Sequence, residues 1–410
     1  MRVVLRGGSV FDPRGGGVTA ADLAVADGRI AAVGPGLDGE STVDVAGRVL
    51  LPGLFDCHVH LLVSHIDMWR TLQTPLSYRF FEAERNLAAT LRLGITTVRD
   101  GGGADLGLKQ AVEDGLVAGP RMHISIKMLS QTGGHGDDLL PSGAAAPLFA
   151  TYPGSPSGLV NGPDEVRRKV RELVRDGADV IKVATSGGVL SPRDNPRHAH
   201  FRPAELEVLV EEASAAGRPV MAHAQASEGI KNAIRAGVRS IEHGIYLDDE
   251  AIELMLRHGT YLVPTLVAPQ GVIDAAGAGA QIPAASVRKA QEVVEVHRAS
   301  FRAAVAAGVR IAMGTDTGVT PHGQNLREFA LMAAGGMSPA GVLAASTLTA
   351  AELLGVADEL GTLEPGKRAD IVVVRGDPFE LATLAEHIEA VWKDGVPVVE
   401  QGRLLGGESR

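Results

Sequence analysis

The sequence predicts an α/β protein, a (β/α)8 barrel of the TIM type with a small β-sandwich domain composed from both chain ends. In the middle of the chain, apolar strand candidates, glycine-rich loops and amphipathic helices alternate. At both ends, short apolar segments follow one another with turn residues between them and no helical period. The expected domains are residues 1–52 plus 356–410 for the composite domain and residues 53–355 for the barrel.

The two chain ends are expected to form one sheet structure together. Near the amino end, the strand candidates are separated by Gly and Asp and lie at 2–5, 21–26, 30–33 and 43–51. Near the carboxyl end they lie at 369–375, 390–393 and 396–400. Each set alone has too few strands to form a stable covered sheet, so we expect the two sets to pair.

The middle of the chain contains eight strand candidates, at 53–62, 95–100, 122–127, 180–185, 219–224, 240–245, 260–266 and 309–314. The helices between them are expected at 163–176, 204–216, 228–236, 249–258 and 287–307. Eight β/α units fit a barrel, in which reactive groups lie at the carboxyl ends of the strands. An open doubly wound sheet is the alternative, although no GxGxxG loop opens a helix after a strand.

Composition excludes several classes of protein. The 410 residues are 45% apolar and 21% charged, which allows a large core. The net charge is 39 − 49 = −10 without a Lys/Arg cluster, so a nucleic-acid partner is not expected. A signal peptide and an 18-residue apolar run are both missing, which favours a cytoplasmic protein without a membrane partner. With Cys57 as its single cysteine, the chain cannot build a multi-cysteine zinc site.

Histidines recur at the ends of the predicted strands. His58 and His60 end the first strand, and side chains two apart on a strand face the same side. This pair alone is a weak signal, because two exposed histidines are common. However, His223 ends the fifth strand, His243 ends the sixth, and Asp316 follows the eighth. Several strands therefore bring metal-ligand residue types to one rim of the barrel.

A lysine lies within the fourth predicted strand. Lys182 is surrounded by apolar residues in ADVIKVATSGG, although lysine normally avoids full burial. Burial lowers the pKa of an amine, and a free amine can take up carbon dioxide to give a carbamate that bridges two metal ions. The alternative is an ordinary lysine that pairs with a carboxylate or binds a phosphate, and the spacing alone favours it as much as the carbamate.

Together these residues resemble the amidohydrolase superfamily, in its binuclear branch with a carboxylated lysine. The stretches TTVRD, TGGHGD, SIEHG, GTYLVPTL and GTDTGVTPHG, followed by GTLEPGKRADIVVV, are similar to prolidase-like and imidazolonepropionase-related dipeptidases. The resemblance covers nearly the whole chain. It implies that His58, His60 and Asp316 hold one metal ion, that His223 and His243 hold a second, and that carboxylated Lys182 bridges them.

The resemblance also implies a reaction. Two divalent ions lower the pKa of a bridging water to about 7 and so provide a hydroxide nucleophile. Asp316 would take the proton and pass it to the departing amine. The expected activity is hydrolysis of an amide in a small molecule, either a dipeptide of the Xaa-Pro or Xaa-Arg/Lys type or an N-acyl amino acid. Zinc is the expected metal, manganese and cobalt suit the same ligands, and relatives suggest a homo-oligomer.

Further residues are candidates for contacts with the substrate. His135, among the glycines of SQTGGHGDD, is expected to donate a hydrogen bond to the substrate carbonyl; the alternative is a solvated loop histidine. Gln225 and His322 are also predicted substrate contacts. Asp100 either orients a ligand or caps a turn. The Arg- and His-rich loop at 191–203 offers cations for a substrate carboxylate.

Other functions fit the same residues less well. A lactonase, esterase or phosphotriesterase is the main alternative, because the same metal pair attacks esters. Deaminases of the superfamily lack the strand-four lysine and carry Glu three residues after the strand-five histidine, where this chain has Ala226. A cyclic amidohydrolase is a further alternative. A non-catalytic barrel would have at least one broken ligand position, and all of them are filled.

Overall fold

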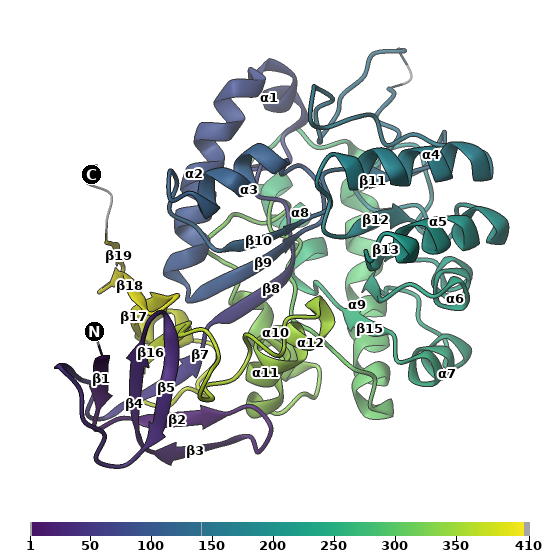
Figure 1. Ribbon diagram of the computed structural model, residues 1–410. Helices are drawn as coiled ribbons and strands as arrows, with labels where there is room; N and C mark the ends of the chain where they lie inside the picture. The colour runs from purple at the N-terminus through teal and green to yellow at the C-terminus, as the bar shows by residue number, and fades with distance from the viewer. Residues whose placement is uncertain (1, 141, 406–410) are drawn as a thin grey trace.

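The computed structural model describes residues 2–140 and 142–405. Strands from the two chain ends lie together at one end of the molecule, beside the barrel (Figure 1). The first of their two sheets has the order β5-β4-β1-β6. Its strands are β1 (Arg2–Arg6), β4 (Asp22–Ala26), β5 (Arg29–Gly34) and β6 (Ser41–Asp44).

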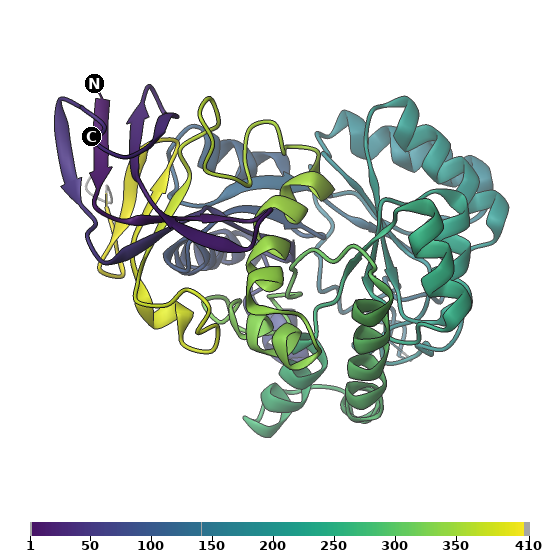
Figure 2. The ribbon, with the colours of Figure 1, turned by 90° about the horizontal axis from the view of Figure 1, so that it is seen from below.

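The second sheet joins the two chain ends directly. It has the order β19-β18-β17-β16-β7-β2-β3, and β16 pairs with β7 in antiparallel register. Its strands are β2 (Ser9–Asp12), β3 (Gly17–Ala20), β7 (Arg48–Pro52), β16 (Ile371–Arg375), β17 (Ile388–Lys393), β18 (Val396–Glu400) and β19 (Arg403–Leu404). In Figure 2 the purple and yellow strands stack against each other.

The predicted β-sandwich is therefore confirmed, but β2, β3 and β19 were not expected and one expected strand is wrong. The single strand expected at 43–51 is divided into β6 and β7, because Gly47 has a φ of +70° and Asp44 accepts a hydrogen bond from the Ala46 N–H. Buried apolar residues of both sheets fill the space between them, among them Leu5, Leu50 and Trp392. The expected domain ranges stay a prediction, and residues 1 and 406–410 lie outside the described part.

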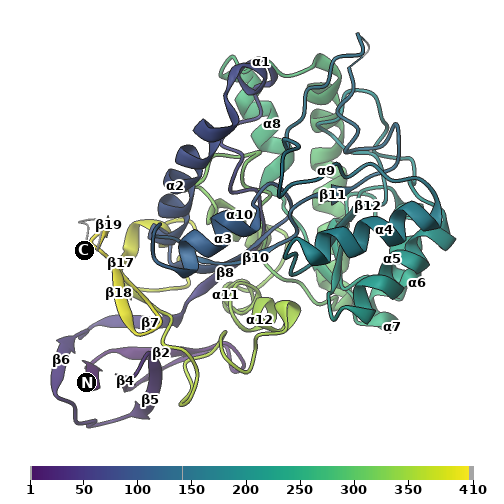
Figure 3. The ribbon, with the colours of Figure 1, turned by 45° about the horizontal axis from the view of Figure 1, so that its top comes forward.

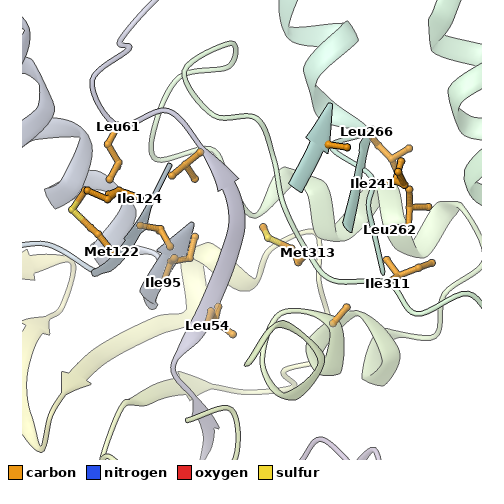
Figure 4. Close-up of a cluster of buried hydrophobic side chains, with 14 of the residues drawn as sticks. Leu54, Leu61, Ile95, Met122, Ile124, Ile241, Leu262, Leu266, Ile311 and Met313 are labelled. Carbon is orange, nitrogen blue, oxygen red and sulfur yellow. The ribbon is translucent and has the colours of Figure 1, made fainter. Parts of the chain in front are cut away.

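The barrel strands run parallel to one another. One group has the order β10-β9-β8 and the other the order β11-β12-β13-β14-β15. Their bounds are β8 (Leu54–Val59), β9 (Ile95–Asp100), β10 (Arg121–Ile124), β11 (Met128–Leu129), β12 (Ile181–Ala184), β13 (Val220–Ala224), β14 (Ser240–His243) and β15 (Tyr261–Val263). Buried apolar side chains from both groups, such as Ile95 and Leu262, belong to one hydrophobic cluster that also includes helix residues (Figure 4).

The eighth predicted strand, at 309–314, is wrong as a regular strand. The Leu262 N–H donates to the Arg310 carbonyl, and the Cys57 N–H donates to the Met313 carbonyl. The segment thus lies between β15 and β8 and closes the barrel. Its ladder is interrupted because the Met313 N–H donates outward, to the Ala345 carbonyl in α11 (Pro339–Ala345).

Helices surround the barrel on its outer side (Figure 3). Their bounds are α1 (Met68–Gln73), α2 (Leu76–Arg92), α3 (Leu106–Glu113), α4 (Gly162–Arg175), α5 (Pro203–Ala215), α6 (Ser227–Ala236), α7 (Asp249–His258), α8 (Val267–Gly277), α9 (Ala284–Ala307), α10 (Arg327–Ala334) and α12 (Leu348–Leu354). On α4, Val166, Val170 and Leu173 are buried as the helical period predicts. Among the described helices, none has the length and apolar character needed to cross a bilayer.

Candidate metal centre and active site

Three ligand-type side chains converge at the carboxyl end of β8. The Nε2 atoms of His60 and His58 lie 3.0 Å and 3.5 Å from Oδ1 of Asp316. One ligand atom from each of these residues lies within 4.8 Å of the other two. Imidazole and carboxylate groups at this spacing are typical of a site for a divalent metal. His58, His60 and Asp316 therefore form a metal-binding group, as predicted.

Asp316 is fixed by backbone contacts to β8. It has a φ of 60°, in the left-handed region, and its N–H donates to the His58 carbonyl at 2.7 Å. Asp56, buried beneath, accepts hydrogen bonds from Oγ1 of Thr315 at 2.7 Å and from the His58 N–H at 3.1 Å. Burial raises the pKa of the Asp56 carboxyl to about 6. These bonds hold the Asp316 segment against the strand that carries both histidines.

In both of these histidines, Nδ1 is occupied by the protein. The Nδ1 of His58 donates to Oε2 of Glu242 at 2.8 Å, and the Nδ1 of His60 donates to the Gly102 carbonyl at 2.8 Å. Because carboxylate and carbonyl oxygens only accept, each neutral ring keeps its hydrogen on Nδ1. Nε2 is then left with a lone pair toward Asp316, as a metal ligand requires.

His223 and His243 form a second pair close to the first. Their ring centres are 4.7 Å apart, and the His243 ring lies 5.1 Å from that of His58. The Nδ1 of His243 is 2.7 Å from Oγ1 of Thr265, and the Nε2 of His223 donates to the Gly187 carbonyl at 3.1 Å. Each ring therefore has one nitrogen held by the protein and one available to a cation.

Lys182 lies between the two pairs. Its side chain is 1% exposed, and its Nζ is 3.3 Å from the Nε2 of His58. Burial lowers the pKa of the Lys182 amine to about 8. In the part of the chain that the structure describes, this amine forms no ion pair with a carboxylate. The paired-lysine alternative is therefore not what the structure shows.

A buried ion pair beneath the metal-binding group was missed by the sequence analysis. Glu242, which accepts from His58, also accepts from the Nη2 of Arg99 at 2.8 Å and from the hydroxyl of Ser240. Arg99 in turn donates to the Cys57 carbonyl at 2.7 Å. The charged residues in TTVRD and SIEHG were the available signal. However, a charged residue in a predicted strand does not reveal whether its side chain points into the barrel.

A second missed contact supports His243. Thr265, its hydrogen-bond partner, has a φ of 53°. The N–H groups of the next two residues, Leu266 and Val267, donate to the two carboxyl oxygens of Glu328 at 2.7 and 2.8 Å. Burial raises the pKa of Glu328 to about 8. Glu328 thus fixes the amino end of α8 and, through it, the position of Thr265.

The sequence pattern of the amidohydrolase family matches residues 49–401. This chain belongs to the amidohydrolase family. It is a metal-dependent amidohydrolase, an enzyme that acts on C–N bonds, and its His/His/Asp group is typical of that family.

Relatives share both sequence and fold. The chain is 37% identical to the ochratoxinase of Aspergillus niger over 363 residues, which cover 85% of this chain and 75% of that enzyme. A crystal structure of a Xaa-Pro dipeptidase with bound methionine is 34% identical, with a TM-score of 0.88 over 98% of this chain and 100% of the other. A prolidase complexed with N-methylphosphonate-L-proline is 36% identical, with a TM-score of 0.90 over 98% and 100%.

The metal-binding group lies at the bottom of a cavity. We call the predicted ligands the floor; they are His58, His60, Lys182, His223, His243 and Asp316. The rest of the lining is mostly apolar, and we call its apolar side chains the wall. Its side chains include Ile66, Met68, Leu139, Leu140, Leu148, Phe149, Val189, Leu190, Ile245, Val272, Ile282 and Val319. Such a wall favours a substrate with a large apolar group.

Two of the predicted substrate contacts reach this cavity. His135 lines it, with its ring stacked on that of His223 at a centroid distance of 4.1 Å. Gln225 lines it as well, is 4% exposed, and has a buried Oε1 without a hydrogen-bond partner in the described structure. An amide oxygen left unpaired in this way is available to a hydrogen-bond donor of a ligand.

His322 lies elsewhere. It is not among the residues that line the cavity, and its Nε2 faces the carbonyls of His60 and Val63 at 3.3 and 3.0 Å. The predicted substrate contact is therefore corrected to a backbone contact that holds the loop after β8. The spacing of His322 from Asp316 could not distinguish the two, because a turn reverses the chain between them.

The cations of the 191–203 loop do not line the cavity either. Arg193 reaches toward the Leu139 carbonyl at 3.5 Å, and Arg197 lies over the ring of Tyr246 at 4.3 Å. The structure thus gives no support to their proposed contact with a substrate carboxylate. Asp100 accepts hydrogen bonds from the N–H groups of Leu61 and Gly102. It therefore caps the turns that follow β8 and β9, next to the floor.

Proposed function

We propose that this amidohydrolase cleaves the amide bond of a dipeptide or an N-acyl amino acid that carries a large apolar group. His58, His60 and Asp316 would hold one divalent cation, and His223 and His243 a second, with zinc the expected metal. Bound in this way, two cations supply a hydroxide at neutral pH and polarise the carbonyl. The observation that carries the proposal is that each of these histidines has one ring nitrogen held by the protein and the other available to a cation.

Lys182 is proposed to act as a carbamate that bridges the two ligand groups. Its amine is buried between His58 and the second pair of histidines, without an ion-pair partner in the described structure. An unpaired buried ammonium is costly, whereas a carbamate supplies two oxygens to the cations beside it. Carbon dioxide is then a constituent of the active enzyme.

Asp316 and His135 are the proposed catalytic residues. Asp316 would accept a proton from the attacking water and transfer it to the departing amine, which leaves poorly without one. His135 would form a hydrogen bond to the substrate carbonyl. Gln225 would accept a hydrogen bond from the substrate at its Oε1, which has no partner within the described structure.

The wall supports an apolar substrate over a cationic one. Lys127, which also lines the cavity, donates to the carbonyls of Phe149 and Ala150. Asp137 accepts from the N–H groups of Gly133 and Leu139. These two charges are engaged within the protein, and burying a further charge against apolar groups is costly. The similarity to an ochratoxinase and to Xaa-Pro dipeptidases agrees with an amide substrate.

A substrate panel tests this proposal. The zinc-loaded enzyme would be assayed on N-acyl-phenylalanine, Phe-Pro, Ala-Arg and the ester that matches N-acyl-phenylalanine, with bound metal measured in parallel. We expect two equivalents of metal per chain, turnover of the apolar amides, and loss of turnover on chelation. Turnover confined to esters, or a preference for Ala-Arg, would contradict the proposal.

A variant of Asp138 separates the two amide classes. This residue also lines the cavity, and burial raises the pKa of its carboxyl to about 6. If the substrate is a free dipeptide, Asp138→Asn should raise KM for Phe-Pro, because the ammonium group of the dipeptide loses an anionic partner. KM for N-acyl-phenylalanine should stay unchanged in the same variant.

A further inference from the structure

One aromatic side chain belongs to the wall of the cavity. Among the described residues that line the cavity, Phe149 alone has a phenyl, phenol or indole ring. Its ring centre lies 4.9 Å from that of the floor residue His60, with an angle of 40° between the ring planes. The ring also covers the turn after β9, where a Cβ added to Gly102 or Gly103 would lie 3.5 Å from it. Phe149 therefore brings an aromatic face from the wall to the edge of the floor.

Phe149 belongs to a segment that forms neither helix nor strand. We call this segment, residues 148–151, the strap. Two of its side chains, Leu148 and Phe149, line the cavity. A segment without a backbone ladder must satisfy its carbonyls in another way. In the strap, three successive carbonyls accept hydrogen bonds from the side chains of two cations.

The first of these cations, Arg79, reaches the strap from α2. Its Nη1 donates to the Leu148 carbonyl at 3.0 Å, and its Nη2 donates to the Thr71 carbonyl in α1 at 3.1 Å. The carboxylate of Glu82, also on α2, pairs with Arg70 instead. Arg79 is not among the residues that line the cavity. It therefore ties the strap to α1 from outside the cavity.

The second cation, Lys127, lies between β10 and β11. Its Nζ is within hydrogen-bond distance of three oxygens of the strap, the carbonyls of Phe149 and Ala150 and the hydroxyl of Thr151, at 2.5, 3.2 and 3.4 Å. An ammonium group has three hydrogens to donate. All three have acceptors in the strap. Lys127 lines the cavity but has no hydrogen left for a substrate carboxylate.

We propose that Phe149 is a specificity-determining residue whose ring packs against the apolar group of the substrate, and that Arg79 and Lys127 are the positioning residues that fix this ring. The inference rests on the proposed hydrolysis of an apolar amide. An aromatic ring adds a stacking contact to the apolar area that aliphatic side chains of the wall provide. A substrate with an aromatic group therefore gains a contact that a small substrate lacks.

Paired substrates test this role on the zinc-loaded enzyme. kcat/KM is measured for N-acyl-phenylalanine against N-acyl-alanine and for Phe-Pro against Ala-Pro, with bound metal determined in each preparation. Phe149→Leu keeps apolar area but not the ring, so the preference for the aromatic member of at least one pair should fall by roughly 2- to 10-fold. Phe149→Tyr keeps the ring and should keep most of the preference. Phe379→Leu, at a partly buried ring that does not line the cavity, is the matched control and should change neither preference.

The position of the ring can be measured without substrate. In enzyme labelled with fluorinated phenylalanine, the 19F signal of Phe149 is the one lost in Phe149→Leu. Arg79→Met removes the donors to the strap and to α1, so it should shift this signal and lower the same preference, and Arg79→Lys should restore part of both. Arg85→Met, at an exposed arginine of α2, is the matched control and should change neither. If Arg79→Met does not fold, Lys127→Met decides, because it removes the other donors to the strap.

Two results would overturn this inference. One is an unchanged preference in both pairs in Phe149→Leu; if both members of a pair lose the same factor, the ring supports His60 and does not select. The other is an unshifted 19F signal in Arg79→Met, which would remove the positioning role. Binding of L-phenylalanine and L-alanine, measured by calorimetry, needs no turnover. If no amide is hydrolysed but Phe149→Leu lowers the preference for phenylalanine, the proposed function fails and the role of Phe149 stands.

Discussion

The floor and the wall of the cavity differ in how their side chains are held. On the floor, each histidine has a hydrogen-bond partner outside the metal group, and these partners are themselves fixed, as Glu242 is by Arg99. On the wall, the side chains are held by apolar packing of loops and helix ends, as Val272 and Ile282 are. Hydrogen bonds have direction, whereas apolar contacts do not.

This difference indicates that the floor and the wall have different functions. A metal site tolerates little displacement of its ligands. The floor side chains accordingly lie at strand ends, where buried polar contacts hold them in place. The wall excludes water and selects the substrate by size and apolar character. Changes on the floor should therefore alter kcat and metal binding, whereas changes on the wall should alter KM.

The largest effect is expected at Asp316. Asp316→Asn keeps an oxygen that can contact a cation but loses the carboxylate that accepts a proton. We expect kcat to fall by roughly 10²- to 10⁴-fold, with much of the metal retained. Metal analysis and steady-state kinetics on the same preparation measure both. Near-normal turnover would show that another group is the base.

Lys182→Ala should also abolish turnover, because the proposed bridge between the two cations is removed. A small carboxylic acid supplied at high concentration should restore part of the activity by occupying the space left by the side chain. Lys182→Arg is the matched control, since it keeps a positive charge that cannot form a carbamate under these conditions. Full activity of either variant without added acid would contradict the carbamate.

The sequence was sufficient for the strand-borne part of the floor. His58 and His60 share a face because a strand has a period of two, and His223, His243 and Asp316 follow from strand ends that meet at one rim. The repeated alternation of strands and helices likewise predicted the barrel. A homo-oligomeric state and a cytoplasmic location stay predictions.

The remaining features depend on contacts that have no local period. His322 was predicted to touch substrate but contacts the loop after β8. The two carbonyls that it contacts are 262 and 259 positions away along the chain. The segment at 309–314 has the composition of a strand, yet Met313 bonds to α11. The hydrogen-bond partner of His135, Ser191, likewise comes from the loop after β12. Each of these contacts is set by packing between distant elements.

The support beneath the floor is tested by Glu242→Gln. His58 keeps a hydrogen-bond acceptor, but Arg99 is left buried without its counter-charge. We expect metal affinity or activity to fall by roughly 10- to 100-fold, and the free energy of unfolding to fall by about 3 kcal/mol or more. Metal titration and urea unfolding measure the two effects. Glu250→Gln on α7 removes a charge from an exposed ion-pair cluster and should cost less than about 1 kcal/mol.

The smallest effect is expected on the wall, from Ile282→Val. Ile282 lines the cavity and is partly buried against the same apolar cluster as Ile273, which does not line it. Removing one methylene from the wall loses about 0.8 kcal/mol of apolar contact with the substrate, which raises KM for an apolar amide about fourfold. The floor is untouched, so kcat should not change.

Ile273→Val makes the same chemical change in the same cluster and should leave KM as it was. If Ile282→Val instead lowered kcat with KM unchanged, the wall would be coupled to the chemistry on the floor. The separation of selection from catalysis in this cavity would then not hold.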